Sequence, residues 1–206
     1  SSKISTLRRR LVSIGVIHKL KGHYLDTKHP IIIENLMGIK RTKGSKQIGK
    51  KPLLINHLKE IINVINQQDI DEIVKLRNKT LILIGFGGGF RRSELISIDY
   101  DDVEFVDEGV KIILKKSKTD QSGEGMVKAI PSFKNTEYCP VDHLKNWMNE
   151  SKNNFVFPIS DKNVALIIKK YAQIAGLDEK KYAGHSLRSG FATTTAELGA
   201  SERNIM

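Results

Sequence analysis

The 206-residue sequence has little cysteine, few aromatic side chains and no long apolar run. Its one cysteine, Cys139, excludes an internal disulfide framework and is typical of proteins that fold in a reducing cytosol. No apolar run reaches about 18 residues and no secretory-signal pattern stands at the start, so neither a membrane span nor secretion is predicted. A hydrophobic content of 39% still allows one good core, with room for part of a second.

Acidic residues are scarce in the first third of the chain. Residues 1–60 hold 14 Lys and Arg against 3 Asp and Glu, which accounts for the whole net charge of +11, whereas residues 61–206 hold 20 of each kind. A basic segment joined to a neutral body favours a polyanionic partner, most often nucleic acid. A solubilising or disordered basic arm is the alternative.

The pattern of apolar and charged residues divides the chain into three parts. Residues 1–43 have helical spacing on both sides of Pro30, which suits a helix start. Residues 44–51 are basic, contain two glycines and have the composition of a linker. Residues 52–206 have the apolar periodicity of a globular body.

Within that body, helical periodicity predicts helices near residues 58–65, 69–84, 91–98, 139–149, 161–175 and 186–198. Alternating apolar residues predict strands at 103–106, 110–115 and 126–130, the first two joined by a tight turn at 107–109. The expected fold is mainly α with a small three-stranded antiparallel sheet, an α+β arrangement.

The stretch from Gly85 to Gly89 comes between an apolar helix and two arginines. A nucleotide-binding loop is one interpretation, but Phe90 stands where the dinucleotide pattern needs glycine, and the Gly-Lys-Ser/Thr of a phosphate loop is absent. Arg91 and Glu94 have the i,i+3 spacing that places an arginine beside a supporting carboxylate. That pairing suits a bound phosphate.

Three other groups of residues are ambiguous when taken alone. Cys139 and His143 have the spacing of a zinc pair, but no second pair is near, so no metal is predicted. His185 and Arg188 have i,i+3 spacing at a helix start, which suits either a phosphoryl-transfer pair or an ordinary helix histidine beside an unrelated surface arginine. The buried side of that helix is expected to include Leu187, Phe191, Thr194 and Leu198. The basic segment 115–120 is either a solvated hairpin tip or a hairpin that delivers a lysine to a leaving group.

Taken together and in this order, three of these motifs resemble the tyrosine recombinase (phage integrase) family. The sequence FRRSEL at 90–95 looks like the first arginine motif of that family, and GHSLR at 184–188 looks like the second. The sequence KSKT at 116–119 matches the hairpin lysine. The resemblance covers about residues 52–206 as an integrase-type catalytic domain. It further implies that 1–43 is the end of a helical core-binding domain, followed by the linker 44–51.

The resemblance implies a site and a reaction. Arg91 and Arg188 would bind the scissile phosphate, Lys118 would protonate the leaving 5′ oxygen, and His185 would handle the proton of a tyrosine nucleophile. Glu94 would hold Arg91 or His185 in place. The family forms a 3′-phosphotyrosyl link to DNA and needs no metal or nucleotide cofactor.

The expected nucleophile is missing, because no tyrosine follows Arg188 and Tyr182 precedes the second motif. The resemblance therefore indicates an incomplete catalytic domain that cannot cleave DNA by itself. A type IB topoisomerase-like enzyme, a DNA-binding regulator that kept the fold, and an unrelated basic domain remain alternatives.

Double-stranded DNA is the expected partner, with self-association on DNA into a tetrameric synapse, in the cytoplasm of a bacterium or phage host. No membrane partner is expected. The residues predicted to contact DNA are Arg8, Arg9, Arg10, Lys40, Arg41, Lys43 and Lys46.

Overall fold

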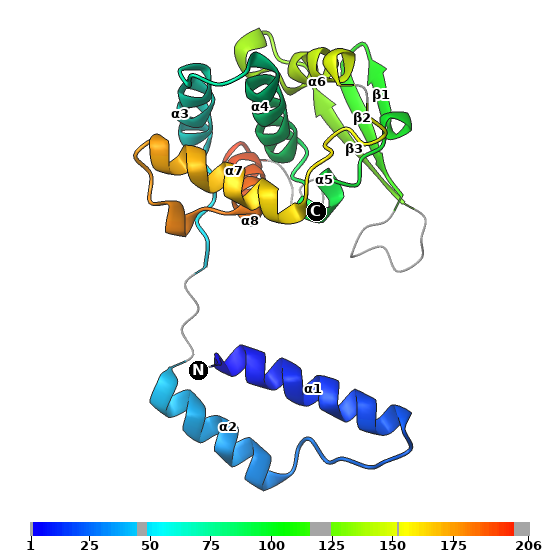
Figure 1. Ribbon diagram of the computed structural model, residues 1–206, viewed down its shortest axis with the longest axis vertical. Helices are drawn as coiled ribbons and strands as arrows, with labels where there is room; N and C mark the ends of the chain where they lie inside the picture. The colour runs from blue at the N-terminus through cyan, green and yellow to red at the C-terminus, as the bar shows by residue number, and fades with distance from the viewer. Residues whose placement is uncertain (1, 45–48, 116–124, 152, 200–206) are drawn as a thin grey trace. The chain divides into compact units, whose positions relative to one another are not determined.

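The computed structural model describes residues 2–44, 49–115, 125–151 and 153–199 (Figure 1). The chain forms two compact units, Ser1–Gly49 and Lys50–Met206. Each unit has its own internal packing. None of the helices within the described ranges is long and apolar enough to cross a membrane.

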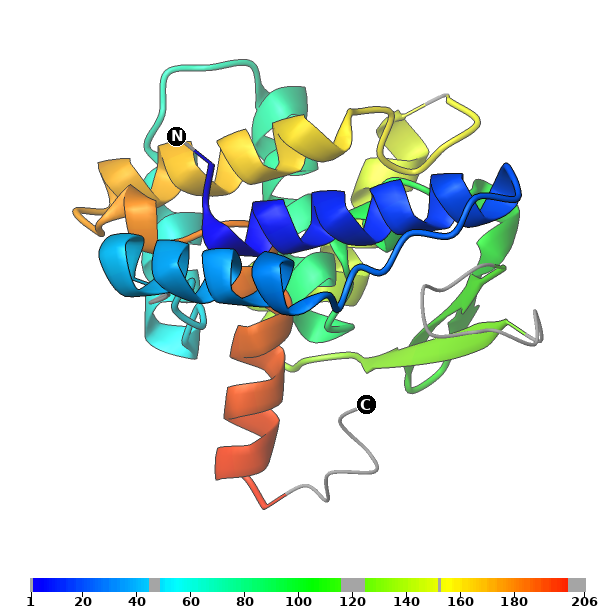
Figure 2. The same cartoon turned by 90° about the horizontal axis from the view of Figure 1, so that it is seen from below.

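The first unit is a pair of helices joined by a loop (Figures 1 and 2). Helix α1 spans Ile4–Leu20 and helix α2 spans Pro30–Lys43, and the two pack against each other. Pro30 occupies the first turn of α2, where no backbone donor is needed, and the ring of His29 accepts a hydrogen bond from the Ile31 amide at 3.3 Å. The break between the two helices therefore lies where the sequence predicted it.

The second unit is built around helix α4, Glu72–Gly87, whose last turns are almost wholly buried. Figure 1 shows α3, Ile55–Asn66, on one side of α4 and α6, Pro140–Glu150, on the other. Helix α7, Asp161–Ile174, and helix α8, Gly184–Glu197, also contact α4. These helices share one hydrophobic core that includes Phe90, Trp147, Tyr171 and Leu187.

The sheet has three antiparallel strands in the order β1-β2-β3, as the sequence predicted. The strands are β1, Val103–Val106, β2, Gly109–Leu114, and β3, Met126–Pro131. In the register of β2 and β3, Val110 lies opposite Ile130, and Ile112 lies opposite Lys128. Strand β3 packs against α6, which ties the sheet to the helical core (Figure 1).

Several helix boundaries differ from the predictions, and the ends of α4 and α5 differ most clearly. Helix α4 does not stop at residue 84 but continues through Gly85 to Gly87, because its end is packed inside the core. Helix α5 covers only Arg92–Leu95 rather than 91–98. It stops early because the Ile98 carbonyl accepts a hydrogen bond from the Val156 amide at 2.9 Å, which requires extended backbone there.

Candidate functional site

The turn after α4 is the structural centre of the site. The Phe90 amide donates to the Gly85 carbonyl at 3.1 Å, and the Gly89 amide donates to the Phe86 carbonyl at 3.0 Å. With Gly89 at φ 56°, this is a Schellman motif, which ends a helix with a residue in the left-handed region. The turn leaves the carbonyl oxygens of Gly88 and Gly89 to accept side-chain donors, and it leads directly into Arg91.

Arg91 is held by Glu94 through two hydrogen bonds. Its Nη1 lies 2.6 Å from Glu94 Oε1, and its backbone amide donates to Glu94 Oε2 at 2.8 Å. The Glu94 side chain is only 3% exposed and that of Arg91 is 22% exposed. The buried Glu94 carboxylate accepts from both the backbone amide and the guanidinium group of Arg91, and this fixes the guanidinium group. The contact that the spacing of Arg91 and Glu94 predicted is therefore present.

Arg188 reaches the same turn from α8. Its Nη1 donates to the Gly89 carbonyl at 2.9 Å. The neighbouring Leu187 is 1% exposed and belongs to the core, and the Ser186 hydroxyl caps the helix start by accepting from the Ala183 amide at 3.0 Å. The fold therefore brings Arg91 and Arg188 to the same turn, Gly88–Phe90, although the two arginines are far apart in the sequence.

A third cation, Lys128, also binds this turn, and the sequence reasoning missed it. Its Nζ donates to the Gly88 carbonyl at 2.7 Å and lies 5.2 Å from the centre of the Phe90 ring. Burial lowers the Lys128 pKa below its ordinary value, and the positive charge of Arg188 lowers it further, while Glu94 acts in the opposite direction. The available signal was the strand alternation, because Lys128 shares the inward face of β3 with Ile130.

Arg92, the residue after Arg91, has a structural role in the packing of the unit. Its Nε lies 3.3 Å from Asp161 Oδ1 at the start of α7. Its side chain also lies so close to Gly184 that a Cβ there would be 1.9 Å from Arg92 Cδ. Arg92 therefore connects α5 to the starts of α7 and α8.

Of the other two predicted catalytic residues, the structure describes only His185. His185 is exposed at the start of α8, whereas Arg188 is half-buried. Lys118 and the DNA-contact candidate Lys46 lie outside the described residues. At the end of β2, Lys115 binds Asp102 at 2.8 Å and Asp99 at 3.0 Å, and these hydrogen bonds raise its pKa.

The basic residues predicted to contact DNA in the first unit lie on its surface. Arg8, Arg9 and Arg10 are exposed on α1. Lys40, Arg41 and Lys43 are exposed in the last turns of α2. Each set is a compact group of positive charge on one helix, which is suitable for a polyanionic surface.

The expected buried side of α8 is only partly correct. Leu187 is in the core, but Leu198 is 81% exposed, and Phe191 and Thr194 are half-buried. Figure 2 shows the reason, since the C-terminal half of α8 extends away from the other helices of its unit. Phe191, Thr194 and Leu198 line an apolar groove of about 420 Å³, together with Phe133.

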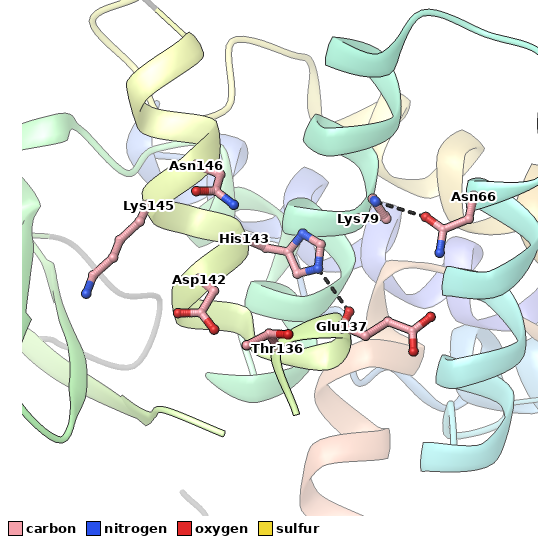
Figure 3. A pocket seen from close by; sticks show the side chains of 8 residues that line it. All are labelled: Asn66, Lys79, Thr136, Glu137, Asp142, His143, Lys145 and Asn146. Atoms are coloured by element: carbon pink, nitrogen blue, oxygen red, sulfur yellow. Dashed lines mark hydrogen bonds between the residues drawn. The ribbon is translucent and has the colours of Figure 1, made fainter. Parts of the chain in front are cut away.

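A second hollow, of about 500 Å³, lies between α4 and α6 (Figure 3). His143 projects into it, with Nε2 2.9 Å from the Glu137 carbonyl oxygen, and burial lowers the His143 pKa. Cys139 is buried and accepts a hydrogen bond from the Phe133 amide at 3.4 Å. Within the described ranges, no three His, Cys, Asp or Glu side chains are grouped as metal ligands.

Comparison with protein families gives a match to the description "Phage integrase family" over residues 51–206. Among curated proteins, the "Integrase/recombinase xerD homolog" of Selenomonas ruminantium is 38% identical over the whole chain, which covers 64% of that protein. The Syntrophus aciditrophicus "Tyrosine recombinase XerC" is 26% identical over 97% of the chain. The chain thus spans less than two thirds of the length of these relatives.

Among solved structures, the XerH site-specific recombinase bound to its difH substrate is similar, with a TM-score of 0.63. The alignment covers 99% of this chain and 62% of XerH at 19% identity, so it shows a shared fold. The mainly helical fold with a small antiparallel sheet, predicted from the sequence, is confirmed by this likeness.

Proposed function

Because the chain belongs to the phage integrase family, we propose that it is the DNA-binding and phosphate-binding part of a site-specific tyrosine recombinase. The observation that carries the proposal is the attachment of Arg91 and Arg188 to one turn. Arg91 follows the turn and is held by Glu94 at 2.6 Å, and Arg188 donates to the Gly89 carbonyl at 2.9 Å.

Two fixed guanidinium groups suit phosphoryl transfer in DNA. In the transition state, negative charge increases on the non-bridging oxygens of the scissile phosphate, and donors that are already oriented stabilise it without reorganisation. Glu94 supplies this orientation for Arg91 and Gly89 supplies it for Arg188. Loss of either arginine should lower the cleavage rate by about 10²–10³, as for other preorganised anion sites.

The proton transfers complete the proposed reaction. A tyrosine hydroxyl oxygen bonds to phosphorus and gives its proton to His185, whose exposed position on α8 leaves its ring accessible. The bond from phosphorus to the 5′ oxygen breaks, and Lys118 supplies a proton to that oxygen. A 5′ hydroxyl then reverses these steps on another strand. The reaction needs no redox partner and no nucleotide.

The 206-residue sequence has no tyrosine after Arg188, where the resemblance to the family places the nucleophile. We therefore expect this chain to bind DNA without forming a covalent link. Residues 1–43 would be the end of a core-binding domain, 44–51 a basic linker and 52–206 the catalytic domain. Further copies would assemble on the same DNA in the bacterial cytoplasm; a lambda integrase tetramer on a Holliday junction shares this fold, with a TM-score of 0.54.

The test uses the 206-residue chain with a fluorescent duplex and with a nicked suicide substrate. We expect binding that weakens steeply with salt, and no covalent adduct on a denaturing gel. Arg188→Gln should weaken binding, whereas Lys170→Gln on α7 should not, because Lys170 lies over the Tyr171 ring and contacts no part of the turn in the described structure.

Two outcomes would contradict the proposal. Binding that does not change with salt concentration would favour an unrelated basic domain. A covalent adduct formed by this chain would show that its nucleophile is a residue other than the one expected beyond Arg188.

A further inference from the structure

Lys128 lies at the junction of the two predicted arginine motifs. Its ammonium group binds the Gly88 carbonyl at 2.7 Å, and the next carbonyl along the chain, that of Gly89, binds Arg188 at 2.9 Å. Two cations from β3 and α8 therefore bind consecutive carbonyl oxygens of one turn. A change in the position of that turn would move both cations, and it would also move Arg91, which follows two residues after Gly89.

The charge of Lys128 is unfavourable in the free protein. Burial is the largest influence on its pKa and lowers it, and Arg188 and Arg91 lower it further. Among the described residues, the carboxylate that acts on it is Glu94, which raises the pKa. A lysine whose folded-state pKa lies below its unfolded value costs stability at neutral pH, and the cost disappears as the pH rises from the folded-state to the unfolded-state pKa.

An apolar side chain of the same length would avoid this cost. Replacing a buried charge by a well-packed hydrophobic side chain is often neutral or stabilising. The Lys128 ammonium group lies 5.2 Å from the centre of the Phe90 ring, so an apolar side chain of the same length would meet an aromatic neighbour there. A bound anion is the natural compensation, because it would convert the repulsion among three cations into attraction.

We propose that Lys128 is the third cation of the phosphate site, and that it positions the Gly88–Phe90 turn on which Arg188 is anchored. This rests on the proposed binding of DNA phosphate by Arg91 and Arg188. Lys128 is distinct from the hairpin lysine Lys118 in the sequence motif, and its inward position on β3 directs it to the helix end that precedes Arg91.

The test compares Lys128→Met, which keeps the length and removes the charge, with Lys128→Arg, which keeps the charge. Lys79→Met is a matched control. Lys79 is also half-buried with a pKa lowered by burial, and its Nζ binds an oxygen, Asn66 Oδ1, at 2.9 Å. It lines the hollow of Figure 3 and not the turn.

Affinity for a DNA duplex is measured over a range of salt concentrations, together with thermal unfolding and the Nε–H signal of Arg188 in proton–nitrogen NMR spectra. Lys128→Met should lower the affinity about tenfold, as for loss of one charge-assisted contact. It should reduce the slope of log affinity against log salt by about 0.9. It should also shift the Arg188 signal without lowering the unfolding temperature. Lys128→Arg should restore the affinity, and Lys79→Met should leave the salt slope unchanged.

The proposal is overturned if Lys128→Met binds DNA within twofold of the unsubstituted protein with the same salt slope. It is also overturned if the Arg188 signal does not move, since Lys128 would then not position the turn. If the unsubstituted protein does not bind DNA, the proposed function fails, and the Arg188 signal of Lys128→Met still decides whether Lys128 positions the arginine.

Discussion

Arg188 donates a hydrogen bond to the carbonyl oxygen of Gly89, a residue 99 positions earlier in the chain, at 2.9 Å. This contact fixes the distance between the two arginine motifs, because Gly89 belongs to the helix end from which Arg91 emerges. The proposed phosphate site therefore depends on how α8 is held against α4 as much as on either arginine.

The ion pair between Arg91 and Glu94 should stabilise the fold because Glu94 is buried. Glu94→Gln removes the negative charge and leaves the Arg91 guanidinium with a weaker acceptor. We expect the free energy of unfolding to fall by about 1–3 kcal/mol, measured by denaturant titration. Glu72→Gln is the matched control, since Glu72 binds Lys75 at the same 2.6 Å and the same i,i+3 spacing but is 83% exposed. An equal loss of stability in both variants would contradict the role of burial.

The contact between Arg92 and Gly184 should appear as a coupling energy. Gly184→Ala places a Cβ against the middle of the Arg92 side chain and should destabilise the protein by about 1–3 kcal/mol through overpacking. In an Arg92→Ala background the same substitution should cost much less, because the obstructing atoms are gone. A double-mutant cycle with thermal or chemical unfolding measures the difference. Purely additive effects would show that Gly184 is required for another reason.

Stability should fall as the pH is lowered below the ordinary pKa of histidine. Burial lowers the His143 pKa in the folded protein, so the unfolded state binds a proton first as the pH decreases. Neutral His143 therefore makes its full contribution to stability above its unfolded-state pKa. This contribution is lost as the pH falls from there through the lower, folded-state pKa. Unfolding midpoints of the unsubstituted protein and His143→Gln over mildly acidic pH give the test. The variant should show a weaker pH dependence, and an unchanged dependence would assign the effect to other groups.

Neutralising the arginine triplet of α1 should weaken binding to every DNA sequence equally. Arg8, Arg9 and Arg10 are exposed on one helix, so they are placed for phosphate contacts that carry no sequence information. Replacing all three by glutamine should reduce the salt slope by about 0.9 for each arginine that contacts a phosphate. Anisotropy titrations with several unrelated duplexes provide the comparison. A loss of affinity for only one of the DNA sequences would instead indicate base contacts.

The order of elements could be read from local patterns. Strand β1 begins and ends where alternation predicted it, and Pro30 begins α2 because its ring favours a first helical turn. Local rules were less reliable where the chain is packed inside the core. The glycines from Gly85 onward suggested a break, but the helix continues to Gly87, and Gly89 ends it by adopting positive φ.

The sequence by itself determined the chemical groups of this protein: two arginine motifs, a carboxylate three residues after the first, and a basic N-terminal segment. Their identity and spacing are local properties, and through the resemblance to the integrase family they led to the expectation of a DNA phosphate as the ligand. Only the tertiary structure decided which groups meet. It brought Arg188 and Lys128 to neighbouring carbonyls, and it turned Arg92 toward Asp161 and Gly184. The reason is physical, because such contacts depend on how α8 and β3 pack against the end of α4, and no short stretch of sequence records that packing.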